Sequence, residues 1–315
     1  MPGFRISGPD RMKTKIGLVL GGGAARGWAH IGVIRTLVNE GIVPDIVTGC
    51  SIGAVVGGCF VAGKLDQLEE FARSLSKARV LRFLDFHFNG SGLISGKRLQ
   101  RILENNLKDI AIENLPMRFG AVATELGSGH EIWLTKGSLI EAMRASYALP
   151  GVFDPVRHND RWLFDGALVN PVPITMARAF GADIVICVNL SSDVGPRGTV
   201  IQSSVEQNGD ETPIEQEIEQ RRSWSFPFIR PAERKVNAPG LASVMVDAFN
   251  IVQDRISRSR LAGDPPDILI SPRLRTMNMF EFHRADEAIV SGALAVKRAM
   301  SDIRELMAIE SQPLV

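Results

Sequence analysis

Cysteine is scarce in this sequence of 315 residues, and its pattern does not suggest a disulfide framework. The three cysteines are an odd number, and each lies in an apolar segment: Cys50, Cys59 and Cys187. Such cysteines suit a reducing compartment. Histidine is also sparse, and no group of His, Cys and Asp has the spacing of metal ligands. We therefore expect neither a metal nor another cofactor.

An excess of charge of one sign is missing too. Lys and Arg number 36 against 35 Asp and Glu, which gives a formal net charge of +1. A dedicated nucleic-acid-binding protein usually carries a clear positive excess, often gathered in one patch. The balance therefore predicts no nucleic-acid partner.

Long hydrophobic runs are absent as well. The longest uncharged apolar run, residues 52–63, is shorter than the ~20 residues that a membrane-spanning helix needs. The first fifteen residues include four basic side chains but no apolar stretch of the kind found in a signal peptide. We expect a cytoplasmic protein whose contact with membranes, if it makes any, is peripheral.

What the sequence does contain is an alternation of apolar strands and amphipathic helices. Hydrophobic residues make up 45% of the chain, enough for a sizeable core in one large α/β domain or two smaller ones. Uninterrupted apolar runs such as residues 16–20 are typical of buried parallel strands. Further strands are predicted at 45–49, 118–124, 130–135, 161–164, 183–190 and 267–270, and helices at 30–40, 52–62, 65–75, 97–107, 138–149, 173–181, 241–261 and 284–306.

The motif around which the rest is arranged is Gly49-Cys50-Ser51-Ile52-Gly53, a G-x-S-x-G sequence between a predicted strand and a predicted helix. A sharp strand-to-helix turn of this kind strains the serine backbone and exposes its hydroxyl above the sheet edge. The following helix N-terminus adds positive potential there. The motif favours a nucleophilic serine, although an ordinary helix start with Ser51 as N-cap fits the pentapeptide as well.

A second motif, GGGAARG at residues 21–27, joins the first strand to the first helix. Backbone N–H groups at such a junction can be presented to an anion. The dinucleotide pattern fails because one of its glycines is missing in either register, and the phosphate-loop pattern fails because Trp28 replaces lysine. Two interpretations remain: a tight turn, and an oxyanion hole built from the amides of Gly22, Gly23 or Ala24.

A third motif follows the predicted strand at 161–164, where Asp165 precedes Gly166 and Ala167. A carboxylate at a strand end, followed by glycine, can approach another group at the sheet edge. An Asp-Gly turn without a catalytic role explains the same residues.

Taken in chain order, these motifs resemble those of the patatin-like phospholipases, most closely the bacterial proteins in the group that includes neuropathy target esterase. The matching segments, within about residues 15–190, are residues 21–27, 49–53, 144–153 and 165–167. One departure is Ala24, where relatives often carry a fourth glycine; its N–H group is retained.

The resemblance implies a three-layer α/β/α fold with a mainly parallel central sheet, and hydrolysis of lipid or other acyl esters by a Ser–Asp dyad. Transferred residue by residue, it makes Ser51 the nucleophile that carries the acyl group and Asp165 the base. The remaining implied residues are Gly22, Gly23, Ala24 and Ile52 for the oxyanion hole, and Arg26, Gly27, Gly49, Gly53 and Gly166 as supporting residues of the site.

Two alternatives stay open. An α/β-hydrolase triad is compatible with the chain order of Ser51, Asp165 and His283, although only two predicted strands precede the elbow serine. A catalytically silent regulatory or adaptor protein on the same fold is the other. The presence of a nucleophile, a base and an oxyanion loop together favours an enzyme.

The segment 191–240 differs in composition from the rest of the chain. It is polar, and an acidic half precedes a basic half that contains Trp224, Phe226 and Phe228. This pattern predicts a lid or mobile insertion in a catalytic domain at residues 15–310. We expect a flexible N-terminal segment at 1–14 and a short C-terminal tail at 311–315.

Overall fold

The computed structural model describes residues 14–78, 80, 107–191 and 241–311. By its internal contacts the chain divides into one unit of residues 1–194 with 247–315 and a second of residues 195–246. Several predictions lie outside the described residues: the N-terminal segment 1–13, most of the helix at 97–107, the insertion from residue 192 to 240, and the tail from 312. The sheet and the site described below belong to the first unit.

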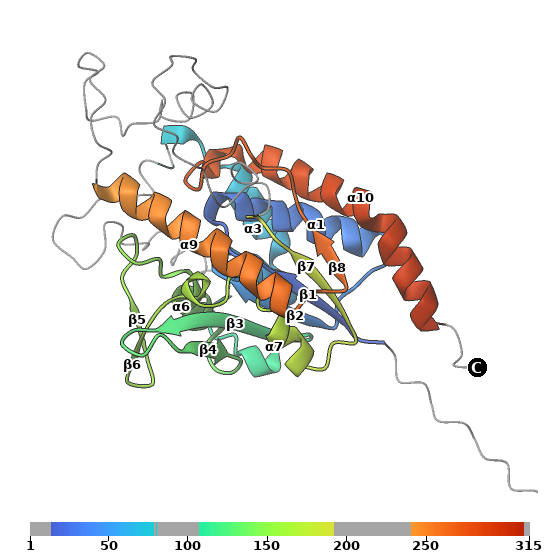
Figure 1. The fold of residues 1–315 in the computed structure, drawn as a ribbon, viewed down its shortest axis with the longest axis horizontal. Helices are drawn as coiled ribbons and strands as arrows, with labels where there is room; N and C mark the ends of the chain where they lie inside the picture. Colours follow the sequence, from blue (N-terminus) through green and yellow to red (C-terminus); the bar gives the residue numbers. More distant parts are fainter. Residues whose placement is uncertain (1–13, 79, 81–106, 192–240, 312–315) are drawn as a thin grey trace, which may run out of the picture. The chain divides into compact units, whose positions relative to one another are not determined.

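In the described part of the chain, eight strands form one sheet, hydrogen-bonded in the order β5-β6-β3-β2-β1-β7-β8, with β4 paired to β3 (Figure 1). The centre is parallel, as predicted from the uninterrupted apolar runs. The parallel strands are β1 (Ile16–Leu20), β2 (Ile46–Cys50), β3 (Arg118–Glu125), β7 (Ile184–Val188) and β8 (Ile268–Ile270). Three strands pair antiparallel: β4 (Glu131–Leu134), β5 (Val156–His158) and β6 (Arg161–Asp165).

Helices cover both faces of this sheet (Figure 1). The apolar side chains of the strands alternate between two clusters: Leu18 and Leu20 belong to the larger, and Val19 between them belongs to the smaller. The larger cluster takes in α1 (Ala29–Asn39), α2 (Ile52–Val61), α3 (Leu65–Arg73), α6 (Leu139–Tyr147) and α10 (Ala285–Ser311). The smaller includes α7 (Ile174–Ala179) and, at its border, Leu261 of α9 (Leu241–Gly263). The fold is therefore the predicted three-layer α/β/α arrangement.

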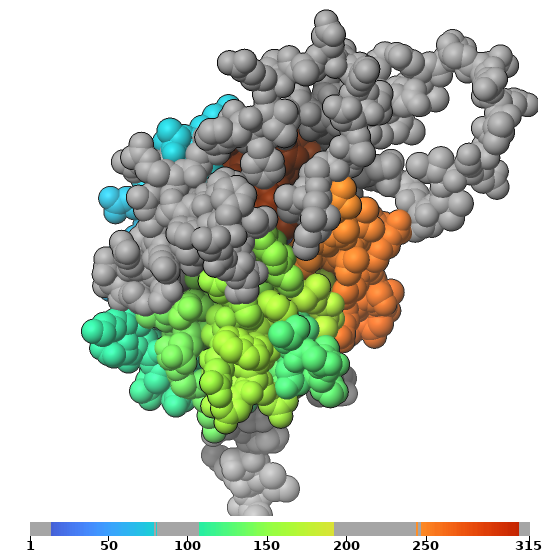
Figure 2. Space-filling model, turned by 90° about the vertical axis from the view of Figure 1, so that its left-hand side faces the viewer, coloured from blue at the N-terminus to red at the C-terminus, as the bar shows by residue number. Residues whose placement is uncertain are grey.

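The last turns of α9 lie against the strand β4 and the segment before α7. Arg260 donates to the carbonyl of Val169 at 3.0 Å and to Glu131 at 3.4 Å. Figure 2 shows α9, in orange, beside the green residues of this part of the chain. These bonds fix the C-terminal part of α9 against the sheet.

Short 3-10 turns connect the regular elements: η1 (Ala24–Trp28), η2 (Ile112–Asn114), η3 (Gly166–Leu168) and η4 (Phe282–Arg284). The sequence did not predict η1, because its residues carry no helical periodicity of their own. Within the helices that the structure describes, none has the length and apolar character needed to cross a membrane.

Candidate active site

The register of β3 brings Ser51 and Asp165 together. Val122 of β3 pairs with Cys50 on one side and with Trp133 of β4 on the other. The next residue, Ala123, pairs with β4 and with Asp165 of β6. Since β4 occupies one edge of β3, β2 and β6 must share the opposite edge. Their carboxyl ends therefore meet head to head, at consecutive residues of β3.

At the end of β2 the chain makes the predicted nucleophile elbow. Ser51 has φ 55° and ψ −125°, a conformation that side-chain-bearing residues rarely adopt, and α2 begins at the next residue. Its backbone N–H donates to the hydroxyl of Ser146 at 2.9 Å. A side chain at Gly49 would meet the backbone of Ala54, and one at Gly53 would overlap the carbonyl of Leu20. The two glycines thus permit the close strand–helix contact that holds the turn.

The hydroxyl of Ser51 donates to Asp165 Oδ2 at 2.6 Å. The other carboxyl oxygen, Oδ1, accepts the N–H of Ala167 at 2.8 Å and lies 3.9 Å from the thiol of Cys50. The backbone of Asp165 is fixed as well, because its N–H donates to Ala148 and its carbonyl accepts from Thr124. The carboxylate is therefore held with one oxygen directed at the serine.

Burial shifts the pKa of this carboxyl group. Asp165 is 2% exposed, and desolvation raises its pKa from 3.8 to about 7, although the hydrogen bonds from Ser51, Ala167 and Cys50 oppose the shift. A pKa near neutrality suits a general base, which must both accept and return a proton. Burial also raises the pKa of Cys50 well above its usual value, so the thiol stays protonated and is not a competing nucleophile.

The glycine loop runs beside this pair. The N–H of Gly21 donates to Val188 and that of Gly22 to Pro171, each at 3.0 Å. The prediction that Gly22 lends its amide to an oxyanion hole needs correction for this reason: the group is already used within the fold. Among the described residues, the N–H groups of Gly23, Ala24 and Ile52 have no acceptor, and all three residues line the pocket that contains Ser51.

Two buried side chains support the loop. His30 is fully buried, and its Nε2 donates to the carbonyl of Gly21 at 2.8 Å. Burial lowers the pKa of His30 to about 4, so the ring is neutral. Arg26, 3% exposed, donates to Asn250 of α9 at 3.2 Å. Arg26 therefore ties the turn after the loop to α9, and Gly27 lets that turn pass against the side chain of Ile52.

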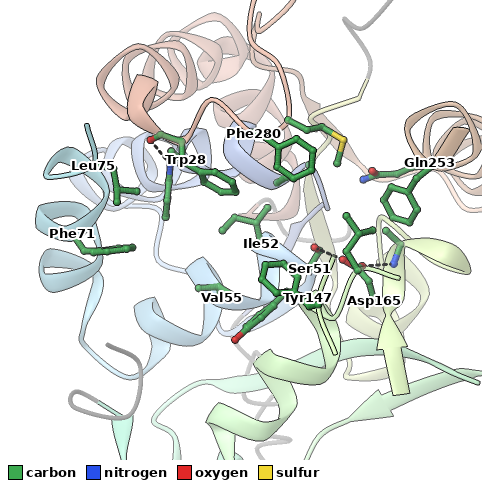
Figure 3. Close-up of a pocket in the computed structure, with 18 residues that line it drawn as sticks. Trp28, Ser51, Ile52, Val55, Phe71, Leu75, Tyr147, Asp165, Gln253 and Phe280 are labelled. Carbon is green, nitrogen blue, oxygen red and sulfur yellow. Dashed lines mark hydrogen bonds between the residues drawn. The ribbon is translucent and has the colours of Figure 1, made fainter. Parts of the chain in front are cut away.

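Ser51 and Asp165 open into a pocket of about 790 Å³, counted together with the space that reaches solvent. Trp28, Phe71 and Leu75 lie at one end, Asp165 and Gln253 at the other, and Ser51 and Ile52 between them (Figure 3). Nearly all of the lining side chains are apolar, with further aromatic rings from Phe153, Phe249, Phe280 and Phe282. Such a pocket excludes water and strengthens electrostatic interactions at the serine.

His283 does not line this pocket, although its neighbour Phe282 does. Within the described residues, the carboxylate of Asp165 accepts from Ser51, Ala167 and Cys50, and none of these is a histidine. The geometry therefore favours a dyad over the triad. In the part of the chain that the structure describes, no group of three or more His, Cys, Asp or Glu residues could hold a metal ion.

Sequence reasoning missed two polar residues of the site. Ser146 lies within the matching segment 144–153, but its burial at the end of a helix becomes informative only when the elbow is placed beside it. Gln253 lies on α9, far from every motif, and nothing in the sequence separates it from a surface glutamine. The structure bonds Ser146 to the backbone of Ser51 and places Gln253 in the pocket that Ser51 lines.

The sequence model of the patatin-like phospholipase family matches residues 18–178, which include the glycine loop, the elbow and Asp165. Together with the three-layer fold, this match shows that the chain belongs to that family. The resemblance inferred from the motifs is thereby confirmed.

Relatives within the family include proteins of the neuropathy target esterase (NTE) group. An uncharacterized NTE family protein of Mycobacterium tuberculosis is 33% identical over 344 residues, covering 94% of each chain. Neuropathy target esterase sws of Drosophila melanogaster is 33% identical over 186 residues, which are 57% of this chain and 13% of that protein. Among solved structures, VipD from Legionella pneumophila is 13% identical with a TM-score of 0.45, covering 91% of this chain and 66% of that one.

Proposed function

We propose that this protein is a serine hydrolase of lipid acyl esters, similar in reaction to a phospholipase A or a lysophospholipase. The observation that carries the proposal is the 2.6 Å hydrogen bond from Ser51 Oγ to Asp165 Oδ2 within an apolar pocket. Membership of the patatin-like phospholipase family supports lipid acyl hydrolysis in general. We further propose that the reaction uses a Ser51–Asp165 dyad and backbone oxyanion donors and passes through an acyl-enzyme.

In the first half-reaction, Ser51 Oγ attacks the ester carbonyl carbon while its proton passes to Asp165 Oδ2. A serine hydroxyl is a weak nucleophile until a neighbour accepts its proton, and the hydrogen bond from Ser51 to the buried carboxylate supports this role for Asp165. The tetrahedral intermediate then breaks its bond to the alcohol oxygen. Asp165 returns the proton to that oxygen, the alcohol leaves, and the acyl group remains on Ser51.

The negative oxygen of the tetrahedral intermediate needs donors that are not used elsewhere. The amides of Gly23, Ala24 and Ile52 meet this condition among the described residues, and Ile52 also opens α2, whose positive end lies at Ser51. Each such donor typically contributes about 3–4 kcal/mol in the transition state. We assign the oxyanion hole to these three amides.

In the second half-reaction, water replaces the alcohol. Asp165 takes a proton from the water as its oxygen attacks the acyl carbon, and the proton returns to Ser51 as the acyl–enzyme bond breaks. The products are the carboxylic acid and the regenerated dyad. The aromatic and aliphatic side chains at the Trp28 end of the pocket suit an acyl chain, because they offer apolar contact without polar partners.

A labelling experiment with a matched control tests this function. Wild type, Ser51→Ala and Ser128→Ala, which alters an exposed serine in a turn, are treated with a fluorophosphonate probe and digested for mass spectrometry. Wild type and Ser128→Ala should be labelled on Ser51 and should hydrolyse short acyl esters and phospholipids. Ser51→Ala should lose at least about 10³-fold of this activity while remaining folded. Folded wild type that neither reacts nor hydrolyses would instead mark a silent adaptor.

A further inference from the structure

Gln253 places an unpaired hydrogen-bond donor in the pocket. The residue lies on α9 and is only 2% exposed. Its side-chain nitrogen Nε2 is buried and has no hydrogen-bond partner in the described structure. A buried donor without a partner lowers the stability of a fold, so such a group needs an explanation.

This nitrogen lies next to Gly22, a glycine-loop residue that also borders Ser51. A methyl group added to Gly22 would lie 2.8 Å from Gln253 Nε2, 3.6 Å from Ser51 Cβ and 3.5 Å from Ala167 Cβ. Gln253 Nε2 is thus packed beside Gly22, on the side of that glycine that also faces Ser51 and Ala167, the residue whose N–H binds Asp165. In Figure 3 the side chain of Gln253 extends from α9 toward this end of the pocket.

Contacts on both sides of Gln253 fix the position of α9 in the fold. Asn250, one turn earlier, accepts from Arg26 at the end of the glycine loop, and Arg260 further along bonds to Val169. The amide is therefore held by a rigid element rather than by a loop, as a group that acts on a reacting atom requires.

We propose that Gln253 is a catalytic residue whose Nε2–H donates to the alcohol oxygen of the ester as that oxygen leaves. The inference rests on the proposed function. Gln253 lies on the Asp165 side of Ser51, where the proton is returned to the alcohol, and away from the Trp28 end of the pocket. As the carbon–oxygen bond breaks, negative charge grows on the alcohol oxygen. The amide stabilises this charge until Asp165 delivers the proton that it took from Ser51.

This role makes the effect of Gln253 depend on the leaving group. An alkyl alcohol leaves as a poor anion and needs the donor, whereas p-nitrophenol, a much stronger acid, leaves without help. Gln253→Met keeps the length and removes the donor. For an alkyl butanoate, kcat/KM should fall by about 10- to 100-fold, the loss expected for a hydrogen bond to a developing charge. For p-nitrophenyl butanoate it should fall by less than about 3-fold.

Stability and a control variant separate this role from a structural one. Because Nε2 is unpaired, Gln253→Met should leave the unfolding midpoint unchanged or raise it. Ser257→Ala, a buried change one turn further on α9, should alter both esters equally or not at all.

An equal loss on both esters in Gln253→Met, or no loss on either, would overturn the inference. Failure of the proposed function would look different. In that case wild type would hydrolyse neither ester, or Ser51→Ala would remain active.

Discussion

The backbone N–H of Ser51 donates to the hydroxyl of Ser146, and this bond joins the nucleophile elbow to the last turn of α6. It holds the main chain of the nucleophile, not its reactive side chain. Within the described residues, the hydroxyl of Ser51 donates to Asp165. The backbone of Ser51 is thus held by a serine, and its side chain is bonded to a carboxylate.

Ser146→Ala should therefore weaken both stability and catalysis. The variant leaves the N–H of Ser51 without its partner, which should lower the free energy of unfolding by about 1–3 kcal/mol. Probe labelling of Ser51 should slow by about 10-fold as its backbone relaxes. Denaturant unfolding and labelling rates measure the two effects. Because the bond is to the backbone, the loss of stability should persist in a Ser51→Ala background; its disappearance there would contradict the assignment.

The backbone strain at Ser51 predicts a difference between two inactive variants. Glycine adopts φ 55° without the steric cost that a Cβ atom imposes, whereas alanine keeps that cost. We expect Ser51→Gly to be about 1 kcal/mol more stable than Ser51→Ala. Both variants lack the hydroxyl, so the comparison isolates the backbone. Equal unfolding midpoints in urea would mean that the elbow stores no strain.

The pKa of Asp165 predicts how activity depends on pH. Burial raises this pKa to about 7, and the base must be ionised to accept the serine proton. The value of kcat/KM should therefore rise through about pH 7 on a single ionisation and level off above it. Asp165→Asn should be nearly as inactive as Ser51→Ala, because an amide cannot accept the proton. A profile that stays flat from pH 5 to 8.5 would exclude Asp165 as the base.

The same shift predicts how stability depends on pH. Folding raises the pKa of Asp165 from 3.8 to about 7, so the protonated carboxyl is the form that the fold favours. Its stabilising contribution is fully present below pH 3.8 and is lost as the pH rises through about 7. Asp165→Asn carries no charge and should gain stability relative to wild type between pH 5 and pH 8. Urea unfolding of both proteins across this range measures the difference.

His283→Ala distinguishes the dyad from a triad. His283 lies in η4 and does not line the pocket, and Asp165 has its carboxylate oxygens engaged by other residues. We expect kcat to change by less than about 3-fold, against a loss of about 10³-fold or more for Asp165→Asn. A collapse of kcat in folded His283→Ala would require a histidine base.

The motifs of the sequence by themselves singled out Ser51 and Asp165, the two residues that the structure joins by a hydrogen bond. The elbow glycines, Ser51 and Asp165 stand out because each is demanded by local chemistry: a sharp turn, a nucleophile and a carboxylate at a strand end. The parallel strands are predictable for a similar reason, since uninterrupted apolar runs report burial on both faces. Local pattern was enough wherever one residue type alone satisfies a backbone or chemical requirement.

Only the tertiary structure decided which backbone N–H groups remain available and which distant side chains reach the serine. Gly22 and Gly23 are identical in sequence terms, yet Pro171 accepts the N–H of Gly22 while that of Gly23 has no acceptor among the described residues. Ser146 meets the elbow because α6 packs beside it, and Gln253 lines the pocket because α9 is bonded to the end of the glycine loop. β2 and β6 each pair with β3 along the same edge, and this brings Ser51 to Asp165, 114 residues later in the sequence. The sequence does not show this because the hydrogen-bond register exists only in the assembled sheet.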